Sequence, residues 1–132
     1  MRPTLQFFDD DILSINGLIT NGNFSKDDKW VKGAGWSITG GQAVCDGSQP
    51  SSTLIRQNNV FTEEGDYRVT FDLVLVAGQI RPLVGSNGIG SYETATGAVS
   101  QIVTRAGGLF HFYLQANSDF IGTVDNLTVT KV

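Results

Sequence analysis

Three observations predict an all-β protein for this chain of 132 residues. Apolar side chains alternate with polar ones through residues 66–77, and a period of two places one apolar row of a strand against a core. Glycine is abundant, with 16 residues, and only 17% of all residues are charged. Turn-forming residues recur every ten or so positions, as in sandwiches and barrels. These patterns predict an antiparallel two-sheet β-sandwich of roughly 8–10 strands without significant helix.

The clearest local signal is a hairpin. Gly40 and Gly41 separate the runs 36–39 and 42–46, and two glycines can both adopt the positive φ angles of a type I′ turn. The same criteria of alternation and bounding turn residues predict the other strands. These are expected at residues 18–20, 52–57, 66–77, 80–84, 92–96, 98–105, 109–115 and 121–132.

Two of these strands carry additional information. Val74 and Val76 interrupt the polar row of residues 66–77, so the late half of this strand is expected to be covered on both faces. Pro82 has no N–H group for a ladder hydrogen bond, so residues 80–84 are expected to form an edge strand or an irregular one.

Charge and cysteine content exclude several classes of function. The net charge is −4 and the isoelectric point is about 4.7, without a Lys/Arg cluster, which argues against nucleic-acid binding. Cys45 is the only cysteine, so an intrachain disulfide is excluded, and its apolar neighbours predict a small core residue. The N-terminus does not resemble a signal peptide, and no segment is apolar enough to predict membrane insertion.

The chain is expected to divide into an N-terminal extension, residues 1–17, and one β-sandwich domain, residues 18–132. Two interpretations of the extension remain open. It is either an irregular lead-in with a short strand at 12–15, or an arm that docks on a partner through its apolar side chains. The candidate arm residues are Leu5, Phe7, Phe8, Ile12 and Leu13.

Several short motifs occur in a characteristic order. Residues 18–25 read Leu-Ile-Thr-Asn-Gly-Asn-Phe-Ser, Gly35-Trp36 precedes the hairpin, and residues 122–129 contain Asp-Asn-Leu. From residue 18 to the C-terminus, this order resembles the carbohydrate-binding-module-like jelly rolls of the galactose-binding-domain type, which are frequent in virion proteins of tailed phages. The resemblance implies a two-sheet antiparallel sandwich whose first and last strands lie close together.

The same resemblance implies a structural calcium ion in many members, held partly by an acid in the last strand. Asp125 matches that position, whereas Ser25 stands where a second acid is common. A neutral hydroxyl is a poor ligand for a hard cation, so Asp125 is only a weak metal candidate. No cofactor is expected.

Residues with catalytic chemistry do not form a recognisable set, so an enzyme is not expected. His111 is the only histidine and is interpreted as a packed or half-exposed strand residue. Glu63, Glu64 and Glu93 show no spacing typical of a glycosidase acid pair.

Sugar binding needs aromatic rings that stack on C–H surfaces, flanked by polar groups. Trp30, in a polar loop, and Tyr92 are the candidate glycan contacts, whereas Trp36 is expected to close one end of the sandwich. Other residues considered for this role are Tyr113, Gln57, Asn58, Gln101 and Gln115.

The first functional hypothesis is a non-enzymatic accessory protein of a phage virion, either a capsid decoration (cement) protein or a tail-associated structural module. Its expected partners are other virion proteins of the capsid or tail, to which the N-terminal arm would anchor it. A homo-oligomer is expected, with a trimer first. The expected location is the virion, after synthesis in the host cytoplasm. The alternative hypothesis is a lectin-like module that binds a cell-surface glycan.

Overall fold

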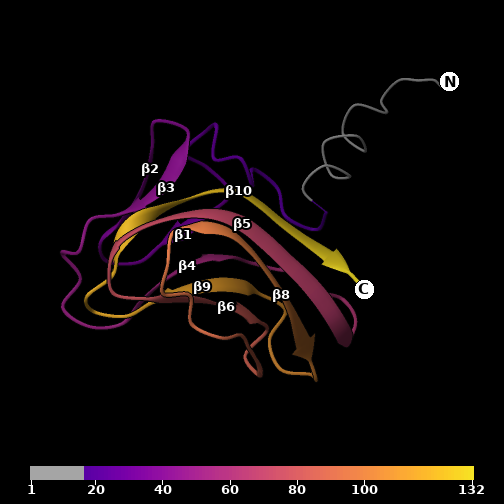
Figure 1. The fold of residues 1–132 in the computed structure, drawn as a ribbon. Coiled ribbons are helices and arrows are strands. Elements are labelled where there is room, and N and C mark those ends of the chain that lie inside the picture. Colours follow the sequence, from indigo (N-terminus) through magenta and orange to yellow (C-terminus); the bar gives the residue numbers. More distant parts are fainter. Residues whose placement is uncertain (1–16) are drawn as a thin grey trace, which may run out of the picture.

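The computed structural model describes residues 17–132. The candidate arm residues Leu5, Phe7, Phe8, Ile12 and Leu13 lie outside this range. The described residues form two antiparallel sheets of five strands each, stacked as a sandwich, which confirms the predicted fold class (Figure 1). No helix that could span a membrane occurs between residues 17 and 132.

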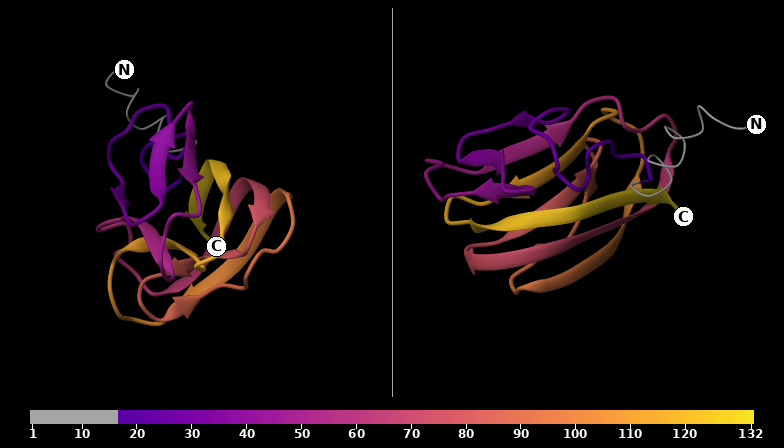
Figure 2. Two further views of the ribbon diagram at one scale, coloured as in Figure 1. Left: turned by 90° about the vertical axis from the view of Figure 1, so that its left-hand side faces the viewer. Right: turned by 90° about the horizontal axis from the view of Figure 1, so that it is seen from above.

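The first sheet, called the long sheet, has the strand order β2-β3-β10-β5-β8. Its strands are β2 (Trp36–Thr39), β3 (Gln42–Cys45), β10 (Ile121–Lys131), β5 (Gly65–Ala77) and β8 (Gly97–Arg105). The second, called the short sheet, has the order β1-β4-β9-β6-β7. Its strands are β1 (Val31–Lys32), β4 (Thr53–Gln57), β9 (Phe112–Ala116), β6 (Ile80–Val84) and β7 (Gly88–Ile89). The long strands β5 and β10 arch over the short sheet (Figures 1 and 2).

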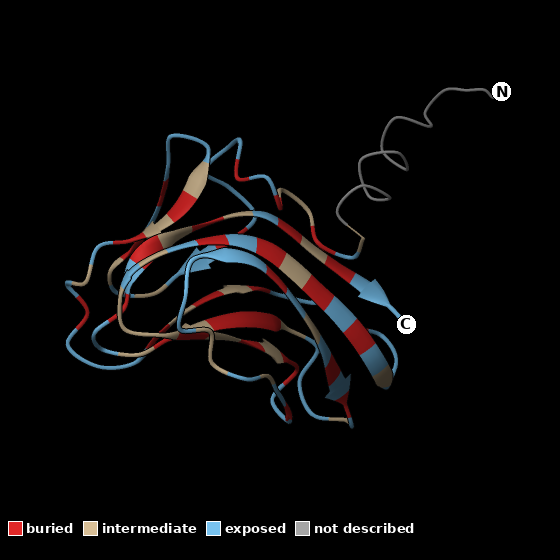
Figure 3. Ribbon diagram, in the orientation of Figure 1, coloured by how far each residue is buried: buried red, intermediate tan, exposed pale blue. Residues whose placement is uncertain are grey.

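Strand β5 follows the predicted alternation over its first nine residues. Tyr67, Val69, Phe71 and Leu73 are buried between the sheets, and the residues between them are exposed or half-exposed. Buried and exposed bands accordingly alternate along the long strands (Figure 3). Pairing with β10 on one side and β8 on the other makes β5 an interior strand. The apolar row therefore anchors the long sheet to the core, as the period of two requires.

The late half of β5 does not follow the prediction. Val74 and Val76 are 50% and 70% exposed, so the expectation that both faces are covered is wrong. Alternation continues in this half of the strand, and it places both valines on the outer face of the long sheet. The apolar character of Val74 and Val76 is therefore not sufficient to predict that they are buried.

Turn chemistry was predicted more accurately than some short strands. Gly40 and Gly41 have φ angles of 61° and 75°, and the hairpin of β2 and β3 forms as expected. Residues 18–20, in contrast, form no strand, although the Leu18 N–H donates to the Val129 carbonyl at 2.7 Å. Residues 92–96 are also irregular.

Strand β6 is flanked on both sides, so it is not an edge strand. Its ladder with β7 involves only Leu83 and Val84, however, and Pro82 lies beyond it. The missing N–H of Pro82 is therefore tolerated without an interruption of that ladder.

The core lies between the two sheets and contains most of the large aromatic side chains. Cys45 is buried there as predicted. Trp36 is also buried, with its ring 5.9 Å from that of Phe120, in agreement with its expected packing role. Burial of these rings provides the main stabilisation of the sandwich, at about 25 cal/mol for each Å² of apolar surface.

Candidate functional site

The outer face of the short sheet carries large polar and aromatic side chains. Its inward positions belong to the core, for example Ile55, Leu114 and Val84. Alternation then sends the intervening side chains of β4, β9 and β6 outward. We call this surface the Tyr113 face. It comprises Val31, Leu54, Arg56, Arg81, Leu83, Tyr92, Tyr113 and Gln115.

Tyr113 lies at the centre of this face because β9 is the central strand of the sheet. Its register partners are Arg56 on β4 and Leu83 on β6. The side chain is only 8% exposed, yet it does not belong to the core cluster. The ring of His111 packs against it edge to face at 6.1 Å. Neighbouring side chains on the outer surface therefore cover Tyr113 and fix its position.

Arg81 is held rigidly beside Tyr113 by two interactions. Its guanidinium lies 4.4 Å from the ring centre of Tyr92, a cation–π contact. Its Nε also donates to Gln115 Oε1 at 2.7 Å. An antiparallel bridge between Ile80 and Glu93 places the segment around residue 92 beside β6. This segment thus adds the Tyr92 ring to the face, although Tyr92 does not belong to a strand of the short sheet.

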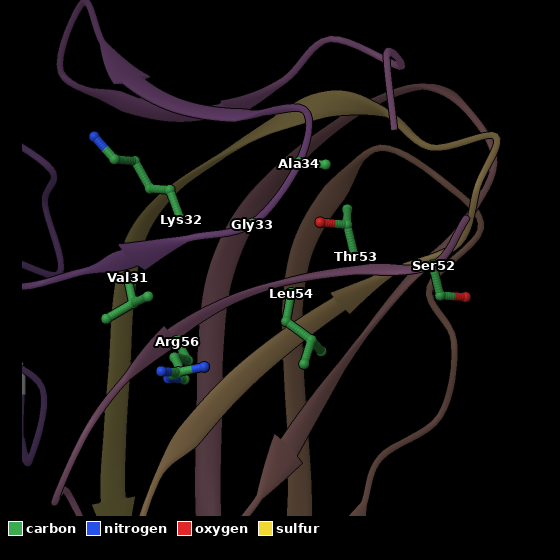
Figure 4. Close-up of a pocket in the computed structure, with 8 residues that line it drawn as sticks. All are labelled: Val31, Lys32, Gly33, Ala34, Ser52, Thr53, Leu54 and Arg56. Atoms are coloured by element: carbon green, nitrogen blue, oxygen red, sulfur yellow. The ribbon is translucent and has the colours of Figure 1, made fainter. Parts of the chain in front are cut away.

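Arg56 lies on the other side of Tyr113 and borders a surface hollow of about 340 Å³ (Figure 4). Its Nε donates to Asn58 Oδ1 at 3.0 Å. The hollow continues the Tyr113 face toward β1 and is comparable with the smaller ligand pockets of proteins. The hollow is lined by Val31, Lys32, Gly33, Ala34, Ser52, Thr53, Leu54 and Arg56.

Gly33 is required for the shape of this hollow. Its N–H donates to the Leu54 carbonyl at 2.8 Å, which connects the end of β1 to β4. A Cβ atom at this position would lie 2.5 Å from the same carbonyl oxygen and 2.6 Å from Thr53 Oγ1. Only glycine permits this close approach of two backbones.

A second hollow, of about 380 Å³, lies beyond the opposite end of β4. It is lined by Asn59, Phe61, Thr62 and Phe110. His111 connects it to the Tyr113 face, because its Nδ1 accepts a hydrogen bond from the Asn59 N–H at 3.0 Å. The prediction of a packed or half-exposed strand residue is correct for the exposure of His111, which is half-buried, but wrong for the strand, because His111 precedes β9.

Trp30 does not lie where the sequence predicted. It is 7% exposed and belongs to the core, so the prediction of an exposed platform is wrong. Its ring centre lies 5.3 Å from that of Phe24 and 6.4 Å from that of Phe112. Its Nε1 donates to the Asn21 carbonyl at 3.1 Å. The apolar ring is thus buried under a polar loop whose backbone satisfies its single donor.

Tyr92, the other candidate glycan contact, is half-buried on the Tyr113 face. Its contact with a glycan stays a prediction. Tyr113 and Gln115 also lie on this face, whereas Gln57 is buried and bonded to Thr20. Gln101 lies on β8 and is bonded to Ser91 and Glu93.

The two arginines of the face were not identified from the sequence. The signal that could have found them is alternation within 53–57 and 80–84, which assigns Arg56 and Arg81 to the side opposite the buried residues. That argument requires the inward side to be known first. The structure provides this information through the core.

A metal site is not evident in the described part of the chain. No group of three or more His, Cys, Asp or Glu side chains occurs among residues 17–132. Asp125 Oδ1 accepts the N–H of Asn126 at 2.8 Å, and the Asn126 side chain donates to Asp72. Asp125 thus accepts a local backbone hydrogen bond at an irregularity in the β10–β5 ladder, and Asn126 connects this irregularity to Asp72 on β5.

Comparison of the sequence with known protein families and with curated proteins found no match. Comparison with solved structures found several similar folds. A mutant of a family 29 carbohydrate-binding module matches with a TM-score of 0.52 and 14% identity, over 78% of this chain and 81% of that one. Another variant of a family 29 module, solved in complex with cellulohexaose, matches with a TM-score of 0.50 and 14% identity, over 78% and 80%.

The enzymatically active domain of tailspike protein 4 of bacteriophage CBA120 is also similar. The TM-score is 0.58 and the identity 12%, over 89% of this chain. The match covers only 22% of the tailspike chain, so this protein corresponds to one part of it. The similarities show a fold like that of carbohydrate-binding modules, which confirms the resemblance at the level of the fold.

Proposed function

We propose that this protein is a non-enzymatic carbohydrate-binding module that binds a polysaccharide across the Tyr113 face. The observation that carries the proposal is the concentration of ring, amide and guanidinium groups on one outer sheet face. Tyr92, Arg81 and Gln115 are held together there by a cation–π contact and a hydrogen bond. Pre-organised side chains lose little conformational entropy when a ligand binds.

The shape of the site supports an extended ligand. One hollow lies beside the Tyr113 face, along β4 from Ser52 to Arg56, and a second lies at Asn59, just after β4 ends. A chain of several sugar rings fits a surface that is open across β4, β9 and β6 and that continues into the hollow beside β4.

The first test is direct binding, with cellulohexaose and a panel of neutral and acidic polysaccharides as probes, measured by calorimetry and affinity electrophoresis. Tyr92→Ala should weaken binding about tenfold, because it removes a ring and releases Arg81. The matched control is Arg68→Ala on the outer face of the long sheet, whose Nη1 donates a long hydrogen bond to Ser100 Oγ at 3.5 Å. Affinity should be unchanged in this control.

The proposal requires that both variants stay folded, which near-UV circular dichroism verifies. Absence of binding to every member of a broad panel would exclude it. Equal losses in Tyr92→Ala and Arg68→Ala would exclude the Tyr113 face as the binding surface.

A second candidate function is a structural or receptor-binding role in a phage particle. The similarity to a domain of a phage tailspike favours it, as does the apolar composition of the N-terminal segment. In this proposal the arm anchors the protein to capsid or tail proteins, and the module faces the host surface. A homo-oligomer, with a trimer first, is part of this proposal.

Deletion of residues 1–16 tests the anchoring. The truncated protein should keep its fold and its affinity for sugar but lose co-sedimentation with phage particles. Co-sedimentation equal to that of the full chain would exclude the arm as the anchor.

A further inference from the structure

We infer that the Tyr113 face selects acidic polysaccharides, through the carboxylates of uronic acid residues bound by Arg56 and Arg81. This inference rests on the proposed function and specifies its class of ligand. Two guanidinium groups on one outer sheet face are notable in a protein of net charge −4.

Each arginine makes one side-chain hydrogen bond within residues 17–132, through Nε, and the Arg81 guanidinium also packs on the Tyr92 ring. Arg81 uses Nε for Gln115 Oε1, and Arg56 uses Nε for Asn58 Oδ1. Within residues 17–132, neither arginine has a hydrogen bond from its Nη1 or Nη2 atoms. A guanidinium held in this way presents two parallel N–H groups, which match the two oxygens of a carboxylate.

No acid of the described chain neutralises these groups. The ion pair present within residues 17–132 joins Lys32 to Asp27, at the rim of the neighbouring hollow. Glu93 is close to Tyr92 in sequence, but its Oε2 accepts a hydrogen bond from Gln101 Nε2 at 2.6 Å. Both arginines are half-buried and form no ion pair within residues 17–132, and the planar guanidinium suits a carboxylate that a ligand brings.

The two arginines lie on opposite sides of Tyr113. Arg56 is its register partner on β4, and Arg81 is paired with Gln115 two residues further along β9. Their strands are separated by one intervening strand, which is a lateral distance of roughly 10 Å. Two guanidinium groups at this distance can each bind one carboxylate of the same polymer. A regular acidic polysaccharide repeats its carboxylates in this manner, whereas a neutral one offers no partner for either guanidinium.

The test compares polymers that differ only in charge. The probes are polygalacturonate, alginate and hyaluronate, each with its carboxyl-reduced counterpart, together with cellulohexaose and dextran sulfate. At least one uronate polymer should bind about tenfold or more tightly than its reduced form, since hydrogen bonds to charged groups are among the stronger ones. Arg81→Gln and Arg56→Gln should remove this preference and keep a residual affinity for the neutral form.

Arg81→Lys keeps the charge but loses the planar pair of donors, so it should behave more like Arg81→Gln than like the wild type. Arg68→Gln, on the outer face of the long sheet, is the matched control and should keep the full preference. Melting curves establish that each variant is folded.

Three outcomes would overturn the inference, and they are distinguishable. Equal binding of the acidic polymers and their reduced forms would refute the charge selection but leave the proposed carbohydrate binding intact. Dextran sulfate binding as tightly as the best uronate polymer would indicate general attraction of polyanions and not recognition of carboxylates. Absence of binding to all probes would refute the proposed function together with the inference.

Discussion

The two outer faces of the sandwich differ in the way their polar side chains are used. On the long sheet, short side chains bond to one another across strands. Thr104 Oγ1 donates to Asp66 Oδ1 at 2.6 Å, and Asn126 Nδ2 donates to Asp72 Oδ2 at 2.8 Å. On the short sheet, the Arg81 guanidinium packs on the Tyr92 ring and donates through Nε to Gln115, and its Nη1 and Nη2 atoms have no hydrogen-bond partner within residues 17–132. Polar side chains of the long sheet thus bond to one another across strands, whereas the terminal guanidinium atoms on the short sheet have no hydrogen-bond partner within residues 17–132.

The faces differ equally in their aromatic content. Tyr92 and Tyr113 belong to the short sheet's outer face. Within residues 17–132, no outward position of the long-sheet strands is aromatic. Because both faces belong to one sandwich, a substitution on the long sheet controls for every general effect of a substitution on the short one.

The largest expected effect comes from the inward side of β9, on which the Tyr113 face depends. Leu114 is fully buried, with register partners Ile55 and Pro82. Leu114→Ala should lower the free energy of unfolding by about 2–5 kcal/mol, through lost burial and a residual cavity. Gln115→Ala, one residue further and outward, should cost no more than about 1 kcal/mol. Urea denaturation measures both. Similar costs for the two variants would contradict the assignment of Leu114 to the core and of Gln115 to the surface.

A smaller effect is expected where the Tyr113 face borders its hollow. In Gly33→Ala the added methyl group would collide with the Leu54 carbonyl, so β1 must move away from β4. The expected cost is about 1–3 kcal/mol, as for other cases of overpacking. Ser52→Ala at the exposed rim is the control and should change the unfolding free energy by less than about 0.5 kcal/mol. An unchanged stability in Gly33→Ala would show that β1 is not tightly attached.

The sequence was sufficient to predict the sandwich, because alternation and paired glycines are local signals. Gly40-Gly41 and the row from Tyr67 to Leu73 behave as expected. It was not sufficient to predict exposure. Trp30 lies in a polar loop yet is buried, because Phe24 and Phe112, distant in sequence from each other, meet around it. Packing of this kind depends on tertiary contacts that local patterns do not contain.

The candidate site was difficult to predict for the same reason. Its side chains come from β4, β6 and β9 and from the segment around Tyr92, which are brought together only by strand order. In the sequence Arg56 and Arg81 are isolated charges with no common motif. Knowledge of which side of each strand faces the core, and of which strands are neighbours, converts them into a pair.

The stability of the fold is expected to depend on pH through Cys45, which is buried between the two sheets. Burial raises the pKa of the Cys45 thiol above its ordinary value of 9.0. The folded state therefore favours the neutral thiol, and its contribution to stability is complete below pH 9. It is lost progressively as the pH rises above 9 toward the higher pKa of the folded state. Urea denaturation of Cys45→Ala should show a weaker loss over this range than the wild type. Identical slopes would exclude Cys45 as the cause.

The smallest expected effect concerns the outer face of the long sheet. Val76 is 70% exposed, so Val76→Thr should change the free energy of unfolding by less than about 0.5 kcal/mol. Val69→Thr on the same strand, fully buried, should cost about 1–3 kcal/mol, because its hydroxyl would lack a partner. Thermal unfolding at several protein concentrations completes the test. If Val76→Thr costs more than about 1 kcal/mol and the wild-type midpoint falls on dilution, a second copy covers this face in solution. The outer face of the long sheet would then be an interface between two copies of the protein, and not a surface exposed to solvent.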